Sequence, residues 1–417
     1  NKKMIIKEIQ GLRSISIILI LLFHLEIPYF DFGFIGVDIF LVISGFIFSK
    51  IIINDYQKGD FKFSKYFNRR IKRLLPALLT TLFLVTILSW LFLVPLDLKY
   101  FGQSLFSSSI FLSNIYYYLI SNDYFSPNSF SLIHLWSLSL EVQFYIIYPI
   151  LFFFIYRYQF LKNKTSNIIF LLLILSFVAN ALYSENEKLI FNFLPFRLWE
   201  FFFGYFIYDL IFNKKNIFFS KKNYKLIFFI LLILIYLIFG NSSLIKHEII
   251  AILSFFLILK VSFNKKNFLS KILNSSLNQN IAKYSYSIFL VHFPIIYFGK
   301  YFGIYGNVPQ IGAEKINNDG LFLIIILIIF FSYFVFNIEK KFYQIGKNKF
   351  ILNINIYLIN FSLLIFLLLG LFFHQSKGIK FRYFLNDKLN SNYFSKAFNY
   401  NSSKKIDGMD CGIFCKK

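Results

Sequence analysis

Residues 13–24 read Arg-Ser-Ile-Ser-Ile-Ile-Leu-Ile-Leu-Leu-Phe-His, an apolar stretch with an ionisable side chain at each end. Arg13 and His24 are eleven residues apart, which is about three α-helical turns and about 16 Å along the axis. Both side chains therefore project from one face of a helix. Ionisable groups inside membrane helices are costly and turn towards a cavity or a partner. We expect one of the two near a helix end, the other near mid-bilayer, and both facing an interior reached from one side of the membrane.

The composition is that of an integral membrane protein. Of the 417 residues, 57% are hydrophobic and 22% aromatic, and only 15% are charged. A soluble domain could not bury so much apolar surface, whereas helices that face lipid can expose it to the bilayer. The first apolar stretch carries Arg13, His24 and Glu26 and has no evident small-residue cleavage site, so we expect it to be retained as a helix.

Apolar runs of spanning length predict an all-α, polytopic transmembrane bundle of about eleven helices. An odd number of spans places the two termini on opposite sides of the membrane. The connection at 95–137 is expected to be the longest outside loop, a possible lid or substrate-contacting element, although 100–120 is apolar enough for a partly inserted helix. The runs are 12–26, 33–53, 74–94, 138–156, 167–183, 191–212, 226–240, 247–263, 284–299, 319–337 and 351–373.

The distribution of basic residues predicts the orientation. The net charge is +24, and 29 Lys and Arg lie in six segments on the N-terminal side of the membrane, against five in the alternate short loops. Cytoplasmic loops collect positive charge, so the N-terminus is expected inside and the C-terminus outside. Because the excess charge is spread over six segments, it does not indicate a nucleic-acid partner.

Polar side chains in the first three helices are candidates for chemistry. A neutral His24 could take a proton from an attacking hydroxyl, although a lone histidine in a helix can equally be structural. In the second helix, Asp38 is a carboxylate near the outer end, and Ser44 lies beside a glycine that permits close helix packing. Before the third helix, Arg69 and Arg73 share a face on the cytoplasmic side. They either add to the positive-inside signal or form a fork suited to phosphates.

The run 134–145, His-Leu-Trp-Ser-Leu-Ser-Leu-Glu-Val-Gln-Phe-Tyr, opens the fourth predicted helix. His134, Glu141 and Tyr145 fall on one stripe, with Ser137 or Leu138 between them, and Trp136 and Ser139 of the same run are further cavity candidates. A glutamate within a spanning helix is a site candidate by default, and an inert polar network is the alternative.

Two later helices carry further candidates. Arg197 and Glu200 are spaced to form an ion pair, which favours a structural role. His292 precedes Pro294 and could be either a functional group or a hydrogen-bonding partner within the bundle. Cys411 and Cys415 have no histidine cluster nearby, so no metal site is predicted, and an extracytoplasmic disulfide is the alternative.

Taken in order, these motifs resemble the acyltransferase-3 family of integral membrane O-acyltransferases. The resemblance covers about 8–343. It rests on the Arg13-to-His24 spacing, residues 33–46, 69–76 and 134–145, the Arg197-x-Trp199-Glu200-x-x-x-Gly204 segment and the Tyr284-Ser285-x-Ser287-Ile288-x-x-x-His292 segment.

The resemblance implies an enzyme that takes an acyl group, usually acetyl, from cytoplasmic acyl-coenzyme A. It would deliver this group to a hydroxyl of an extracytoplasmic glycan, such as lipopolysaccharide O-antigen, exopolysaccharide or peptidoglycan, at the bacterial inner membrane. His24 would be the catalytic histidine with Arg13 as its paired residue, and Arg69 and Arg73 would contact the donor phosphates. Glu141 and Trp136 match motif positions in the acceptor-side cavity, and whether His24 is a base or a transient acyl carrier stays open.

The resemblance also suggests a division of the chain. Residues 1–345 would form the membrane domain, 346–374 the eleventh helix, and 375–417 an extracytoplasmic linker. This arrangement resembles the subgroup in which an SGNH-type domain follows, and we expect that domain to be missing here. Two other readings stay open, a glycan or lipid transporter or flippase and a non-catalytic membrane partner. No internal repeat of the kind seen in inverted-repeat transporters supports the transporter.

Overall fold

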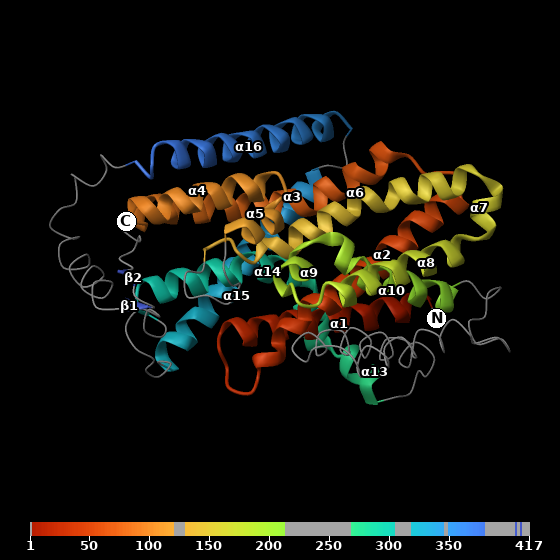
Figure 1. The fold of residues 1–417 in the computed structure, drawn as a ribbon, viewed down its shortest axis with the longest axis horizontal. Helices are drawn as coiled ribbons and strands as arrows, with labels where there is room; N and C mark the ends of the chain where they lie inside the picture. The colour runs from red at the N-terminus through yellow and green to blue at the C-terminus, as the bar shows by residue number, and fades with distance from the viewer. Residues whose placement is uncertain are drawn as a thin grey trace.

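The computed structural model describes residues 2–120, 130–212, 268–304, 318–345, 349–379, 405–406 and 409–410. They form a bundle of helices that run along its long axis (Figure 1). The elements are α1 (Lys2–His24), the 3₁₀ helix η1 (Asp31–Ile35), α2 (Gly36–Gln57), α3 (Phe63–Phe92), α4 (Pro95–Ser109), α5 (Ser113–Ile120), α6 (Leu135–Arg157), α7 (Gln159–Asn163), α8 (Thr165–Leu182), α9 (Glu187–Asn192), α10 (Leu194–Phe212), α13 (Phe268–Leu273), α14 (Ser276–Tyr301), α15 (Asn318–Ile345) and α16 (Lys349–Gln375). Lys405–Ile406 (β1) and Met409–Asp410 (β2) form one short antiparallel pair.

The predicted polytopic helical bundle is confirmed. Nine of the eleven predicted spans correspond to described helices, whereas 226–240 and 247–263 lie outside the described residues. By length and composition, six described segments can cross a membrane: η1 with α2, α3, α6, α8, α14 and α15. Helices suit this role because lipid offers no hydrogen bonds, so backbone groups must be satisfied within the segment. The inside and outside assignment of the termini stays a prediction.

The expected long loop at 95–137 is wrong over most of its described length, because residues 95–120 are largely helical. Pro95 stands at the start of α4, where a missing backbone N–H costs nothing. Phe111, with φ +57°, separates α4 from α5. In Figure 1, α16 lies along α4, and this contact covers the apolar side chains that made the segment hard to classify.

Glycines allow two helix pairs to approach closely. A Cβ atom added to Gly45 of α2 would lie 1.9 Å from the backbone oxygen of Phe201 in α10, and one on Gly204 would lie 2.2 Å from the backbone oxygen of Val42. Gly102 of α4 and Gly370 of α16 face each other in the same way. Small residues at these points let the backbones make close van der Waals contact, which is how helices associate in an apolar environment.

The buried side chains form two clusters that meet at α6. One cluster is built mainly from α2, α6, α8 and α10, and the other from α3, α4, α14, α15 and α16. Trp136 and Phe144 of α6 belong to the first cluster, and Leu135 and Leu138 to the second. A space lined by several helices is left where the two clusters meet, and the candidate site lies there.

Helices α1 and α14 run parallel and pair along their length. The Ser14 hydroxyl donates to Asn278 Oδ1 at 3.0 Å, the His24 and His292 rings lie 5.1 Å apart, and Lys300 forms an ion pair with Glu26. His24 ends α1, but α14 continues nine residues past His292, or about 13 Å. His24 therefore lies within the bundle, short of the end of α14, and its depth in the membrane stays a prediction.

We predict that Gly45→Ala destabilises the fold. The added methyl group meets the backbone of α10 at 1.9 Å, so the two helices must separate. The free energy of unfolding should fall by about 1–3 kcal/mol, measured in detergent by thermal or denaturant unfolding. Leu171→Ala on the outward face of α8, where Leu171 is 58% exposed, is the control and should change stability little. Equal stability of the two variants would contradict the close-packing interpretation.

Candidate active site

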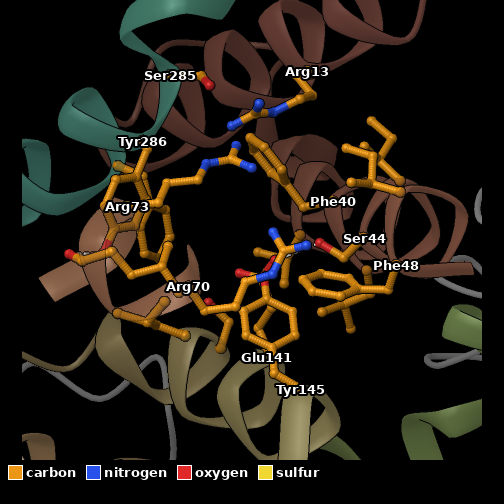
Figure 2. Close-up of a pocket in the computed structure, with 18 of the residues that line it drawn as sticks. Arg13, Phe40, Ser44, Phe48, Arg70, Arg73, Glu141, Tyr145, Ser285 and Tyr286 are labelled. Carbon is orange, nitrogen blue, oxygen red and sulfur yellow. Dashed lines mark hydrogen bonds between the residues drawn. The ribbon is translucent and has the colours of Figure 1, made fainter. Parts of the chain in front are cut away.

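Five helices surround a cavity in the centre of the bundle (Figure 2). Arginines, aromatic rings and one carboxylate face this space, and aliphatic side chains complete its wall. The lining residues are Arg13 and Ile20 from α1, Val37, Phe40, Leu41, Ile43, Ser44, Ile47 and Phe48 from α2, Arg70, Arg73 and Leu74 from α3, Ser137, Leu138, Glu141 and Tyr145 from α6, and Ser285, Tyr286 and Phe289 from α14.

The cavity carries an excess of positive charge. Arg13, Arg70 and Arg73 line it together with a single carboxylate, that of Glu141. In Figure 2 the Arg13 and Arg73 side chains extend towards each other from α1 and α3. Within the described part of the chain, none of the three arginines has a carboxylate within ion-pairing distance. Three guanidinium groups in an apolar, enclosed space favour an anionic ligand, because charge interactions strengthen where water is excluded.

The aromatic wall holds Arg70 in place. Its guanidinium lies 4.2 Å from the centroid of Phe48 and 5.5 Å from that of Tyr66. The ring of Tyr145 packs against that of Phe48 at 3.9 Å and lies 6.0 Å from the Arg70 guanidinium. Such cation–π contacts orient a guanidinium without neutralising it, so Arg70 keeps its donors for a ligand.

Glu141 is oriented by α2. The Ser44 hydroxyl donates a hydrogen bond to Glu141 Oε1, which joins α2 and α6 at the cavity wall. Glu141 lies one helical turn from Ser137 and one from Tyr145, so all three side chains line the same space. Of the stripe predicted from the sequence, Glu141 and Tyr145 line the cavity, whereas His134, just before the first residue of α6, does not.

Three histidines lie together just beyond the cavity. The rings of His24 and His292 are 5.1 Å apart, and those of His134 and His292 are 5.5 Å apart. Phe289 lines the cavity and also packs against His134 and His292, at 5.5 and 5.8 Å. A layer that includes Phe289 thus separates the arginines from the imidazoles.

Each imidazole contacts a backbone carbonyl through one ring nitrogen. His24 Nδ1 lies 2.9 Å from the oxygen of Ile20, His292 Nδ1 lies 2.7 Å from that of Phe289, and His134 Nε2 lies 3.1 Å from that of Leu290. A carbonyl only accepts hydrogen bonds, so the nitrogen facing it carries the proton. In a neutral ring the other nitrogen is then an acceptor with a free lone pair.

Asp38, Arg197 and Glu200 form a buried ion network outside the cavity. Arg197 lies 3.1 Å from Asp38 Oδ1 and 2.7 Å from Glu200 Oε1, and all three side chains are almost fully buried. The Arg197–Glu200 pair expected from the sequence is present, and the structure adds Asp38 of α2. The network links α2 to α10, so its evident role is to hold two helices together.

Other predicted site residues also lie away from the cavity. Arg69 is 43% exposed and pairs with Asp55, so it does not line the cavity with Arg73. Trp136 packs on Phe191 with ring centroids 4.1 Å apart. Ser139 accepts a hydrogen bond from the backbone N–H of Ser113 at 3.2 Å.

Arg70 and Phe289 line the cavity but were not among the site residues predicted from the sequence. Arg70 and Arg73 are three residues apart and Arg69 and Arg73 four apart, so either pair can share a helix face. The rotation of α3 about its axis selects Arg70 and turns Arg69 outwards. Phe289 has no signal in a sequence that contains 61 phenylalanines.

The arginines of the cavity are suited to a phosphate group. Guanidinium groups bind phosphates through charge-assisted hydrogen bonds. Within the described part of the chain, no three His, Cys, Asp or Glu side chains are arranged to hold a metal ion. Cys411 and Cys415 lie outside the described residues, so the structure does not address their role.

Comparison with known proteins places these features in a family. Residues 6–336 match the family described as "Acyltransferase domain". O-acetyltransferase OatA of Staphylococcus aureus strain NCTC 8325 is 30% identical over 324 residues, which cover 72% of this chain and 52% of OatA. SACOL0978 of S. aureus strain COL is 29% identical over 329 residues, covering 74% of this chain and 54% of that protein. The matched part thus spans about half the length of these relatives, and no solved structure matches.

We predict that Arg197→Met destabilises the protein strongly. Removing the guanidinium leaves Asp38 and Glu200 buried without their shared cation. Breaking a buried ion pair costs about 3–5 kcal/mol, measurable by unfolding in detergent. Arg157→Met, at the exposed end of α6, removes an arginine without burying a carboxylate and is the matched control. If both variants unfold at the same temperature, the network does not hold α2 to α10.

Proposed function

Because the chain belongs to the acyltransferase-3 family, we propose that it transfers an acyl group, acetyl in the first instance, from cytoplasmic acyl-coenzyme A to a hydroxyl of an extracytoplasmic glycan. It is a multi-pass integral membrane protein. The acceptor would be a polymer such as lipopolysaccharide O-antigen, exopolysaccharide or peptidoglycan, reached from the bacterial inner membrane. The printed name of OatA, an O-acetyltransferase, supports acetyl as the group.

One observation carries this proposal: a cavity with three arginines ends beside a cluster of histidines. Coenzyme A has a bulky anionic nucleotide and a long, thin arm that ends in the thioester. Arg13, Arg70 and Arg73 would hold the phosphates, and Glu141 would leave the lining with two net positive charges. The arm would extend towards His24, so the acyl group would not cross the membrane as a free species.

His24 is the proposed general base. Its Nδ1 proton is directed at the Ile20 carbonyl, which leaves Nε2 to take a proton. The acceptor oxygen would attack the thioester carbon while its proton moves to Nε2. The carbon–sulfur bond would then break, and the departing thiolate would take the proton from the imidazolium. The products are the ester and free coenzyme A, and His24 returns to its starting state.

The side chain of Phe289 controls the route to this base. It lines the cavity and packs on His134 and His292, between the arginines and His24. For the thioester to reach His24 Nε2, which is buried, the Phe289 side chain would have to move aside. Such a closed resting state would keep water from the thioester until an acceptor binds.

We predict that Arg13→Ala and Arg73→Ala each weaken the binding of acetyl-coenzyme A by about tenfold or more. A hydrogen bond between charged groups contributes about 1.5–3 kcal/mol, and 1.4 kcal/mol corresponds to tenfold. Binding is measured by calorimetry on protein in nanodiscs. Arg69→Ala is the matched control, since Arg69 pairs with Asp55 outside the cavity and should bind the donor normally. Equal affinity in all four proteins would place the donor elsewhere.

We predict that His24→Ala lowers acyl transfer by a factor of about 10²–10⁴ and leaves donor binding intact. Transfer is followed as release of free thiol from acetyl-coenzyme A and as acetyl ester on surface polysaccharide by mass spectrometry. His374→Ala, on α16 beside Gln103, is the control and should transfer at the normal rate. Glycan transport by wild type and His24→Ala alike, without thiol release, would instead identify a transporter.

A further inference from the structure

The His24, His134 and His292 cluster contains three buried ring nitrogens without a partner. These atoms are His24 Nε2, His134 Nδ1 and His292 Nε2, and none makes a hydrogen bond to any described residue. Buried polar atoms in proteins are nearly always paired, so three such atoms in one cluster need an explanation.

All three nitrogens are acceptors. The opposite nitrogen of each neutral ring faces a backbone carbonyl and therefore carries the proton. The described contacts include no hydrogen bond from one imidazole to another, and two acceptors could not form one. The cluster therefore matches a ligand that brings several hydrogen-bond donors.

The surroundings restrict the ligand further. Phe293 packs on His24 at 5.1 Å and stacks on His134 at 5.5 Å, and Phe289 closes the side towards the arginines. Aromatic rings beside three neighbouring acceptors are suited to a sugar ring, which has an apolar face and hydroxyl groups around its edge. A single alcohol would satisfy one nitrogen only, since one hydroxyl has one proton to donate.

We propose that the three histidines form the binding site for a polyhydroxylated acceptor, and that the enzyme recognises two neighbouring hydroxyls of one sugar. His24 takes the proton of the hydroxyl that is acylated, and His292 accepts a hydrogen bond from the adjacent hydroxyl. His134 offers a third acceptor to the same ligand. This inference rests on the proposed acyl transfer to a glycan and adds the residues that select the acceptor and the pair of hydroxyls that they recognise.

The test compares two acceptors that differ by one hydroxyl, cyclohexanol and its vicinal diol, with acetyl-coenzyme A as donor. The whole protein is reconstituted in nanodiscs, and ester formation is quantified by mass spectrometry. We expect wild type to acetylate the diol about tenfold faster or more, because a site built for a hydroxyl rejects an analogue that lacks it. His292→Phe keeps a ring but loses the acceptor atom and should abolish this preference.

Two further variants separate this role from a structural one. His292→Gln retains an acceptor oxygen and should restore part of the preference, whereas His374→Phe, a histidine outside the cluster, should leave it intact. Donor affinity and unfolding temperature are measured for each variant. His292→Phe should bind acetyl-coenzyme A as wild type does, since His292 does not line the arginine cavity.

Several outcomes would overturn the inference. Retention of the diol preference in His292→Phe would remove His292 from acceptor recognition. Equal rates with both alcohols in wild type would contradict the proposed recognition of two hydroxyls. A wild-type protein that binds and turns over acetyl-coenzyme A but acetylates neither alcohol would contradict it as well. A wild-type protein that neither binds nor turns over the donor would instead refute the proposed function itself.

Discussion

Lipid offers no hydrogen bonds, so every polar side chain in this bundle must find its partner within the protein or on a ligand. Most of them do. Arg197 is shared by Asp38 and Glu200, Ser44 donates to Glu141, and Ser14 donates to Asn278. These pairs join α2 to α10, α2 to α6, and α1 to α14. The satisfied polar groups thus assemble the helices that surround the cavity.

Two sets of polar groups without protein partners lie at the candidate site. They are guanidinium groups without carboxylate partners in the cavity and imidazole nitrogens without hydrogen-bond donors beyond it. The guanidinium groups favour an anionic ligand, and the imidazole nitrogens favour a ligand with hydroxyl groups that donate hydrogen bonds. A thioester donor and a sugar acceptor have these two characters, and Phe289 stands between the sets. The order of the two sets along α1 follows from the eleven residues between Arg13 and His24.

Helix α16 packs closely on α4 at the edge of this bundle. It packs on α4 through Gly102 and Gly370, and Gln103 lies 3.0 Å from His374 near the end of the helix. Ile379, four residues after α16, is buried, and Gly378 lies against the backbone of Pro95. The turn that follows α16 is therefore held against the start of α4. In OatA and SACOL0978 the matched region is about half of the protein.

The sequence by itself determined that the chain is a helical membrane bundle, because apolar runs of spanning length have few other solutions. It also singled out Arg13, His24, Glu141 and His292, since an ionisable group in such a run needs a reason to be there. Only the tertiary structure decided which arginine of α3 faces the cavity and that Asp38 forms an ion pair with Arg197. It also decided that residues 95–120 are largely helical. Those outcomes depend on the rotation and contacts of whole helices, which the spacing within one segment does not fix. The meeting of His24, His134 and His292, from three distant parts of the chain, is of the same kind, because only packing brings them together.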